Sequence, residues 1–156
     1  MSEIYLGNPN LKKANTQIQF SAEQIEEFVK CKNNPVYFAQ KYVKIVSLDE
    51  GLVPFQPYKF QEKLIKRFHK NRFNICKMPR QTGKSTTVVS YLLHYAVFND
   101  SVNIGILANK AATARELLGR LQTAYENLPK WMQQGVLVWN RGSLELENGS
   151  KILAAS

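Results

Sequence analysis

One stretch between two apolar segments constrains this chain more than any other feature of its sequence. Residues 77–86 read Lys-Met-Pro-Arg-Gln-Thr-Gly-Lys-Ser-Thr, with a short apolar run over residues 73–77 and a longer one over residues 84–98. A strand, a loop and a helix in that order form the context in which a Gly-Lys-Ser triplet binds phosphate. The alternative is a chance triplet at the start of a helix, with solvated charges around it. The flanking segments favour a phosphate-binding loop.

Each residue type in the loop has a physical role. Gly83 has no Cβ, so its backbone can approach phosphate oxygens closely. Successive backbone N–H groups and the positive end of the following helix attract anions. Lys84 would reach the β- and γ-phosphates of a nucleotide, and Ser85 would place its hydroxyl on the Mg²⁺ ion that bridges them.

The loop departs from the usual pattern at its start. Met78 stands where the first glycine is expected, and Pro79 stiffens the entry further. Arg80 supplies a permanent guanidinium, which can stabilise the charge that develops on a departing γ-phosphate. We therefore take Arg80 and Lys84 as the candidate catalytic residues.

These residues carry a resemblance. Residues 80–85, without a leading glycine, resemble the variant Walker A motif of the large terminase subunit of tailed bacteriophages, the motor that packages DNA. Three further blocks agree in the family's order: Phe60-Gln61 upstream, then residues 104–110, then residues 139–150. The resemblance runs from about Asn34 to the last residue and covers the front part of a terminase.

The resemblance implies an α/β fold: a parallel sheet of the P-loop NTPase type with flanking helices, incomplete here and preceded by an N-terminal helical segment. It implies ATP and Mg²⁺ as cofactors and double-stranded DNA as a partner. The portal protein, the small terminase subunit and further copies in a ring are the other implied partners, at the procapsid portal in the host-cell cytoplasm. No membrane partner is expected.

Gln61 holds, by this resemblance, the place of a glutamine that reads the adenine edge, since an amide can donate and accept at once. A polar residue on an exposed helix turn is the alternative. The candidate ATP-binding residues are Gln61, Met78, Pro79, Arg80, Gln81, Thr82, Gly83, Lys84, Ser85 and Thr86, with Ser85 also the candidate Mg²⁺ ligand.

We predict three parts along the chain: a mobile arm over residues 1–20, a helical subdomain with a connector over residues 21–57, and the front of an ATPase domain over residues 58–156. Ser21 with Gln24 predicts a capping box. Asn34-Pro35 opens a second helix, since proline suits a first helical turn. Residues 47–57 read as a connector.

Further elements are expected within the ATPase part. A helix over residues 58–70 carries a basic stripe, which is a candidate DNA contact or an ordinary solvated face. A buried strand over residues 101–108 ends at Asn109-Lys110, and a long helix follows over residues 111–128. Asn148-Gly149 predicts a hairpin turn, with Glu145 and Glu147 on the exposed face of a strand. The basic residues of the stripe are Lys59, Lys63, Lys66, Arg67 and Lys70.

Composition limits the classes of protein that the chain can belong to. With 156 residues and 44% hydrophobic content, a folded core is expected, and a net charge of +9 makes nucleic acid or nucleotide a plausible partner. Cys31 and Cys76 read as reduced, packed thiols, and His69 and His94 as structural residues. The N-terminus has no secretory apolar region, and no run is long enough to span a bilayer.

A second acidic site, which an ATPase needs downstream of its phosphate loop, is not found. No carboxylate follows an apolar strand; the candidates considered are Asp100, Glu116, Glu126, Glu145 and Glu147. We therefore expect the N-terminal part of a longer terminase, without its nuclease domain, that binds ATP but hydrolyses it poorly. A helicase-superfamily ATPase and a non-catalytic nucleic-acid or assembly module are the alternatives.

Overall fold

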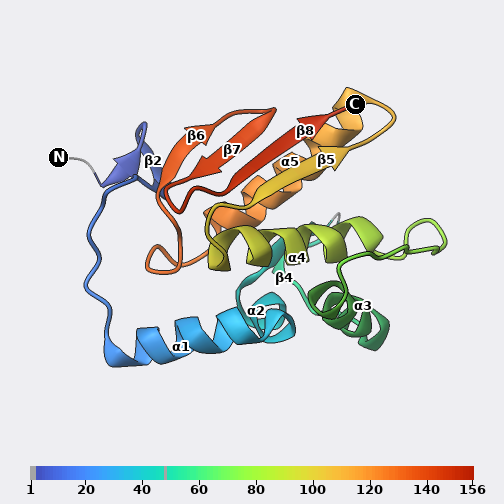
Figure 1. Cartoon of the computed structure of the whole chain (residues 1–156), viewed down its shortest axis with the longest axis horizontal. Coiled ribbons are helices and arrows are strands. Elements are labelled where there is room, and N and C mark those ends of the chain that lie inside the picture. The colour runs from blue at the N-terminus through green and yellow to red at the C-terminus, as the bar shows by residue number, and fades with distance from the viewer. Residues whose placement is uncertain (1–2, 48) are drawn as a thin grey trace.

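The computed structural model describes residues 3–47 and 49–156. Helices and small sheets form a mixed α/β structure in which a sheet, two long helices and a group of shorter helices lie in successive layers (Figure 1). Within the described residues, no helix has both the length and the apolar character needed to cross a bilayer.

The main sheet has four strands in the order β5-β8-β7-β6. β5 (Asn103–Leu107) runs parallel to β8 (Lys151–Ala155), with Ile104 opposite Ile152. β7 (Ser143–Leu146) and β6 (Val136–Trp139) continue the sheet in antiparallel fashion. The sheet is therefore mixed, and the predicted parallel sheet is represented in the described residues by the β5–β8 pair alone.

Helices cover one face of this sheet. α5 (Ala111–Glu126) lies against β5 and β8, and α4 (Lys84–Phe98) packs on α5. α3 (Lys59–Lys70) and α2 (Pro35–Tyr42) pack on the far side of α4, and α1 (Ala22–Asn33) packs on α2. Figure 1 shows these layers from the sheet at the top to α1 and α3 at the bottom.

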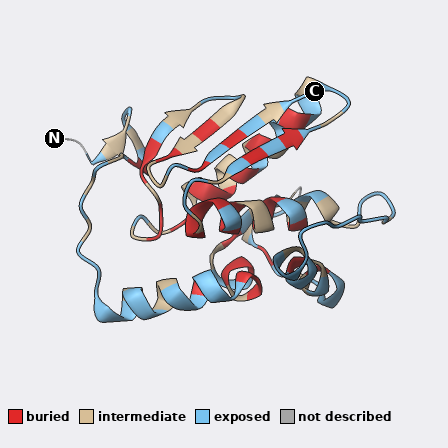
Figure 2. Ribbon diagram, in the orientation of Figure 1, coloured by how far each residue is buried: buried red, intermediate tan, exposed pale blue. Residues whose placement is uncertain are grey.

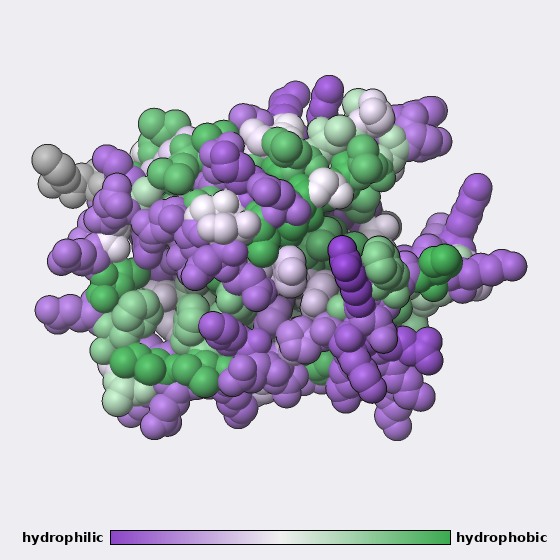
Figure 3. Space-filling model, viewed as in Figure 1, coloured by the Kyte–Doolittle hydropathy of each residue, from purple (hydrophilic) through white to green (hydrophobic). Residues whose placement is uncertain are grey.

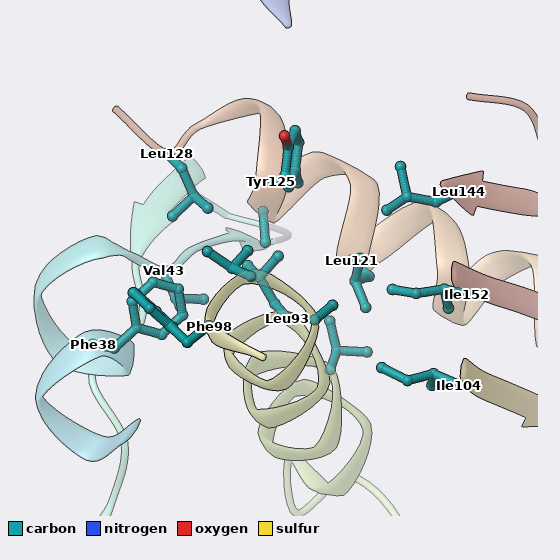
Figure 4. Close-up of a cluster of buried hydrophobic side chains, with 14 of the residues drawn as sticks. Phe38, Val43, Leu93, Phe98, Ile104, Leu121, Tyr125, Leu128, Leu144 and Ile152 are labelled. Carbon is teal, nitrogen blue, oxygen red and sulfur yellow. The ribbon is translucent and has the colours of Figure 1, made fainter. Parts of the chain in front are cut away.

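The core lies where α4, α5 and the sheet meet. Leu93, Leu121 and Ile152 are each at most 1% exposed, and Figure 4 shows such side chains converging from the helices and the strands. Alternation along β5 and β7 places Ile104, Ile106, Leu144 and Leu146 on this buried face (Figure 2). Burial of these apolar groups is the main force that holds the layers together.

The predicted helix starts are confirmed. Ser21 Oγ accepts the Gln24 backbone N–H at 3.2 Å, and Gln24 Oε1 accepts the Ser21 backbone N–H at 3.1 Å, which completes the capping box of α1. Asn34 Oδ1 accepts the Tyr37 N–H at 3.0 Å, with Pro35 as the first residue of α2. Capping is a local interaction, so a few neighbouring residues suffice to specify it.

The predicted strand over residues 73–77 is not formed. This segment has no regular secondary structure between α3 and the loop, with Phe73 83% exposed and Ile75 99% exposed. A strand needs a neighbour for its backbone N–H and C=O groups. No described strand pairs with this segment, so its apolar pattern finds no sheet to join.

The predicted mobile arm is wrong for the described residues at its start; residues 1–2 lie outside the described part. β1 (Ile4–Tyr5) and β2 (Asn8–Lys12) pair as a hairpin, and Leu11 is 1% exposed. Lys12 binds Glu147 across 3.3 Å, which ties the hairpin to the end of β7. The hairpin packs on the rest of the molecule through one buried leucine and through polar contacts with residues far along the chain. The composition of residues 1–20 therefore could not predict this packing.

Two further hairpins differ in how well they were predicted. β4 (Gly51–Pro54) lies within the predicted connector and pairs with β3 (Lys44–Ser47), which directly precedes the connector and shares only Ser47 with it; residue 48 is outside the described part. The Asn148-Gly149 hairpin is confirmed between β7 and β8, with Gly149 at a φ of +83°. That backbone conformation favours glycine, which makes the second hairpin readable from sequence.

Candidate phosphate-binding site

The loop before α4 projects from the body of the molecule. It lies at the right of Figure 1, at the same end as the carboxyl ends of β5 and β8. Ligands of open α/β sheets bind beyond the carboxyl ends of parallel strands. Lys110, predicted at this rim, is the N-cap residue of α5, which begins directly after β5.

The backbone of the loop turns sharply at two residues. Gln81 has a φ of +60° and Gly83 a φ of +74°. The value at Gly83 suits glycine, whereas Gln81 adopts a left-handed conformation that a side chain disfavours. Thr82 Oγ1 donates to Pro79 O at 3.0 Å and closes the turn between them. The loop thus curls so that the chain enters α4 directly from Gly83.

Lys84 closes the loop on itself. Its Nζ donates to Met78 O at 3.2 Å and also to Pro79 O. An ammonium group held by two carbonyl oxygens across the mouth of a loop can exchange them for phosphate oxygens, which are stronger acceptors because they are charged. Met78 and Pro79 therefore contact the Lys84 ammonium group through their carbonyl groups rather than their side chains.

The first turn of α4 faces solvent. Its N-cap residue Gly83 offers no side-chain cap, so the first N–H groups of the helix remain open to an anion. Ser85 is exposed and Thr86 half-buried in that turn, and Arg80 is exposed in the loop. The structure therefore brings Arg80, Lys84 and Ser85 into one short, accessible segment.

Gln61 reaches this loop from α3. It is 3% exposed; its Nε2 donates to Gly83 O at 3.3 Å, and its Oε1 accepts the Tyr58 backbone N–H at 2.9 Å. The expected exposed-turn alternative for Gln61 is therefore wrong, because the side chain is buried against the loop. Gly83 O also accepts from Thr87 through its backbone N–H at 3.0 Å and its hydroxyl at 2.8 Å.

An aromatic pair beside Gln61 was not predicted from the sequence as part of the site. The rings of Tyr58 and Phe60 stack with centroids 5.9 Å apart and an interplanar angle of 10°, and the residues are 71% and 44% exposed. Exposed stacked rings near a phosphate loop offer a flat surface to a base. Their spacing of two residues across the start of α3, with Tyr58 as its N-cap residue, was the available signal.

The basic stripe of α3 is exposed, as a solvated face or a DNA contact would both require. Lys63 and Arg67, with Lys77 from the segment over residues 73–77, line a cavity of about 550 Å³ between α3 and that segment. Phe60 and Ile75 supply apolar walls. This cavity carries positive charge beside the loop, which suits an anionic ligand.

The two hairpin carboxylates differ in environment. Glu145 lies 3.6 Å from Lys151 on the sheet. Glu147 accepts the backbone N–H groups of Asn15 and Gly135, each at 2.8 Å. Partial burial alone would raise the pKa of Glu147. The two N–H donors and Lys12 outweigh this effect and hold the pKa below its usual value. The expected exposed-face position is wrong for Glu147, which anchors the N-terminal hairpin.

The structural interpretation of His94 is confirmed. Its Nε2 donates to Cys31 O at 2.9 Å, the residue is 1% exposed, and burial lowers the pKa of His94 to about 4. Burial likewise raises the pKa of the Cys31 thiol to about 12. Cys76 is exposed, so the expectation of two packed thiols is wrong for that residue.

No protein-family model matches the chain. Among the described residues, no three His, Cys, Asp or Glu side chains gather as a metal cluster would require. The loop itself fits a nucleotide phosphate with Mg²⁺, because Lys84, the open amides of α4 and the Ser85 hydroxyl are the donor set that such a group takes.

Proposed function

We propose that this chain is the ATP-binding part of a viral DNA-packaging terminase motor, which couples ATP hydrolysis to movement of double-stranded DNA into a procapsid. The observation that carries the proposal is the position of Lys84. Its ammonium group bridges the loop carbonyls of Met78 and Pro79 at the open N-terminus of α4. A phosphate bound there would meet the ammonium group and the helix amides together.

The chain's own residues would divide the work. The backbone N–H groups of residues 80–86 and the ammonium group of Lys84 would hold the phosphate oxygens, and Ser85 would ligate Mg²⁺, which neutralises charge on those oxygens. Arg80, exposed in the loop, would stabilise charge at the γ-phosphate. The stacked rings of Tyr58 and Phe60 would support the base.

We also propose that the fold is of the P-loop NTPase type, with residues 73–77 as one of its strands. A cavity of about 590 Å³ separates this segment from β5, and Tyr91 and Leu92 of α4 line it. Phe73 and Ile75 of the segment are exposed and line the other cavity, of about 550 Å³, toward α3. Further strands between the segment and β5 would supply the backbone hydrogen-bond partners that the segment lacks among the described strands.

The partners follow from the same proposal. Double-stranded DNA, the portal protein, the small terminase subunit and further copies of this chain in a ring would be the contacts of the full motor. The place of action would be the procapsid portal in the host-cell cytoplasm. The net charge of +9 and the exposed basic stripe of α3 are compatible with a DNA surface.

The test is titration calorimetry of ATP with Mg²⁺ against the chain and its Lys84→Ala variant, with phosphate release followed in the same samples. Loss of the ammonium group removes charge-assisted bonds, so affinity should fall roughly a hundredfold. Turnover should be negligible, because the sequence downstream of the loop has no carboxylate directly after an apolar strand, where one that activates water is expected.

Lys32→Ala is the matched control, since Lys32 is an exposed lysine in the last turn of α1 and belongs to neither the loop nor the cavity beside it. It should bind ATP nearly as well as the unchanged chain. Arg80→Ala should affect affinity for ATP more than for ADP, since only ATP has a γ-phosphate. Equal affinity of the unchanged chain and Lys84→Ala for ATP would overturn the proposal and favour the non-catalytic module.

A further inference from the structure

We propose that Gln61 is a positioning residue that holds the phosphate loop at Gly83, instead of reading the adenine base. The inference rests on the proposed nucleotide site and assigns a different task to one of its residues. It concerns a buried contact between α3 and the loop, which lie apart in the sequence.

Both ends of the Gln61 amide are already engaged. Oε1 accepts the Tyr58 N–H at 2.9 Å, and Nε2 donates to Gly83 O at 3.3 Å. The partners fix the orientation of the amide, because a backbone N–H can only donate and a carbonyl can only accept. With 3% of the residue exposed, a base edge has no access to the remaining N–H and lone pair.

The contact also restricts the loop sterically. A Cβ on Gly83 would lie 2.5 Å from Gln61 Nε2, closer than atoms can pack. Two features therefore favour glycine at position 83: its φ of +74° and the close approach of Gln61. Any side chain at this position would displace the Gln61 amide from Gly83 and so break this contact.

Gly83 O collects the donors that fix the end of the loop. Besides Gln61 Nε2, it accepts the Thr87 backbone N–H at 3.0 Å and the Thr87 hydroxyl at 2.8 Å. Thr87 is 0% exposed, so two buried side chains hold this carbonyl from opposite directions along the chain. The orientation of the Gly83–Lys84 peptide, and hence of the amide offered to phosphate, follows from them.

This role predicts which ligands respond to substitution. A residue that reads adenine affects ATP but not GTP or tripolyphosphate. A residue that positions the loop affects all three equally, since each places the same phosphate groups there. The ratio of affinities therefore separates the two roles.

Two substitutions of Gln61 separate the loop contact from helix capping. Gln61→Glu keeps an acceptor for the Tyr58 N–H but turns a carboxylate oxygen toward Gly83 O. Gln61→Met keeps the length and loses both hydrogen bonds. Gln40→Met is the matched control, because Gln40 Nε2 donates to Glu62 of α3 at 2.9 Å and does not reach the loop.

The experiment measures the affinities of ATP, GTP and tripolyphosphate, each with Mg²⁺, by titration calorimetry, after circular dichroism has established that each variant is folded. Both Gln61 variants should bind all three ligands about tenfold more weakly, with an unchanged ATP-to-GTP ratio. Gln40→Met should bind as the unchanged chain does. A loss confined to ATP, or no loss in Gln61→Glu, would overturn the inference.

Amide hydrogen exchange of the free protein gives a readout that needs no nucleotide. Loss of the contact should speed exchange at the amides of residues 83–87 in both Gln61 variants and leave it unchanged in Gln40→Met. If the unchanged chain binds none of the three ligands, the proposed function fails, while faster exchange would still support the positioning role. Unchanged exchange in both variants would refute that role by itself.

Discussion

The carboxyl end of α4 is held by hydrogen bonds from residues far along the chain. Its amino end and the loop before it are held mainly by hydrogen bonds within the loop. At the carboxyl end, Asn148 Nδ2 donates to Ala96 O at 2.9 Å and Asn99 O at 3.1 Å. Gln134 Nε2 donates to Val97 O at 3.1 Å. At the amino end, Lys84 and Thr82 bond within the loop, and Gln61 is the contact from another element.

The difference between the two ends shows how one helix can contribute to both folding and binding. Side-chain amides donate to the carbonyls of the last turn of α4, and the apolar side chains of that turn are buried, so its position in the core is fixed. The first N–H groups are left open at the other end, where an anion would find them. Figure 3 shows hydrophilic side chains around the loop on the right, while apolar side chains gather elsewhere, over α1 among other places.

The largest expected effect is on the buried half of α4. Leu93 is 0% exposed, and Leu93→Ala should lower the free energy of unfolding by about 3 to 4 kcal/mol, because it leaves a cavity between α4 and α5. Urea unfolding followed by circular dichroism measures this. Val88→Ala, at a site 36% exposed nearer the loop, should cost less than about 1 kcal/mol. Equal losses would abolish the contrast.

Acid should weaken the same half of the helix through His94. Burial lowers the pKa of His94 from 6.5 to about 4, since protonation would bury an unpaired donor at Nδ1. The unfolded chain binds this proton more readily, so stability is complete above pH 6.5 and falls toward pH 4. The loss should reach about 3 kcal/mol.

Urea unfolding between pH 7.5 and pH 4 measures the loss at His94. His94→Gln, which can still donate to Cys31 O, is the comparison because glutamine does not titrate. The curve of this variant should fall less steeply than that of the unchanged chain. Parallel curves would assign the acid sensitivity to other groups; His69, whose ring lies 6.0 Å from that of His94, is the first to examine.

Removal of the Asn148 side chain should loosen the carboxyl end of α4 moderately. Asn148→Ala removes two donor contacts with carbonyls and the acceptor for Ser150 N–H, so a loss of about 2 kcal/mol is expected in thermal unfolding. Asn71→Ala is the control, since Asn71 makes one such contact, with Arg67 O, at an exposed helix end. A control as costly as the test variant would contradict the predicted difference.

The smallest effect is expected in the loop. Thr82→Ala removes the hydrogen bond to Pro79 O at a half-exposed position, so the free energy of unfolding should change by less than about 0.5 kcal/mol. Thermal unfolding measures it. A loss above about 1 kcal/mol would mean that the loop contributes to the fold as the other end of α4 does.

Local signals in the sequence predicted local structure well. The Ser21 capping box, Asn34-Pro35 and Asn148-Gly149 depend on contacts within a few residues, and each is present in the structure. The bounds of α4 followed from a long apolar run. The residues of the loop were also found from the sequence, although their affinity for a nucleotide stays a prediction.

Features that depend on distant partners were missed. The hairpin of β1 and β2 is held through Lys12 and Asn15, which bind Glu147. The segment over residues 73–77 has the pattern of a strand but no described strand to pair with. Gln61 was singled out by a resemblance, but its burial against Gly83 could not be read from residues near it in the chain.

The sequence by itself determined where helices start, where the chain turns and which residues form the loop, because these depend on neighbouring side chains and backbone preferences. Only the tertiary structure decided that Glu147 anchors the N-terminus, that the sheet is mixed and that Gln61 holds Gly83. Such contacts join residues far apart along the chain. Their existence depends on how the helices and strands pack, which no local pattern contains.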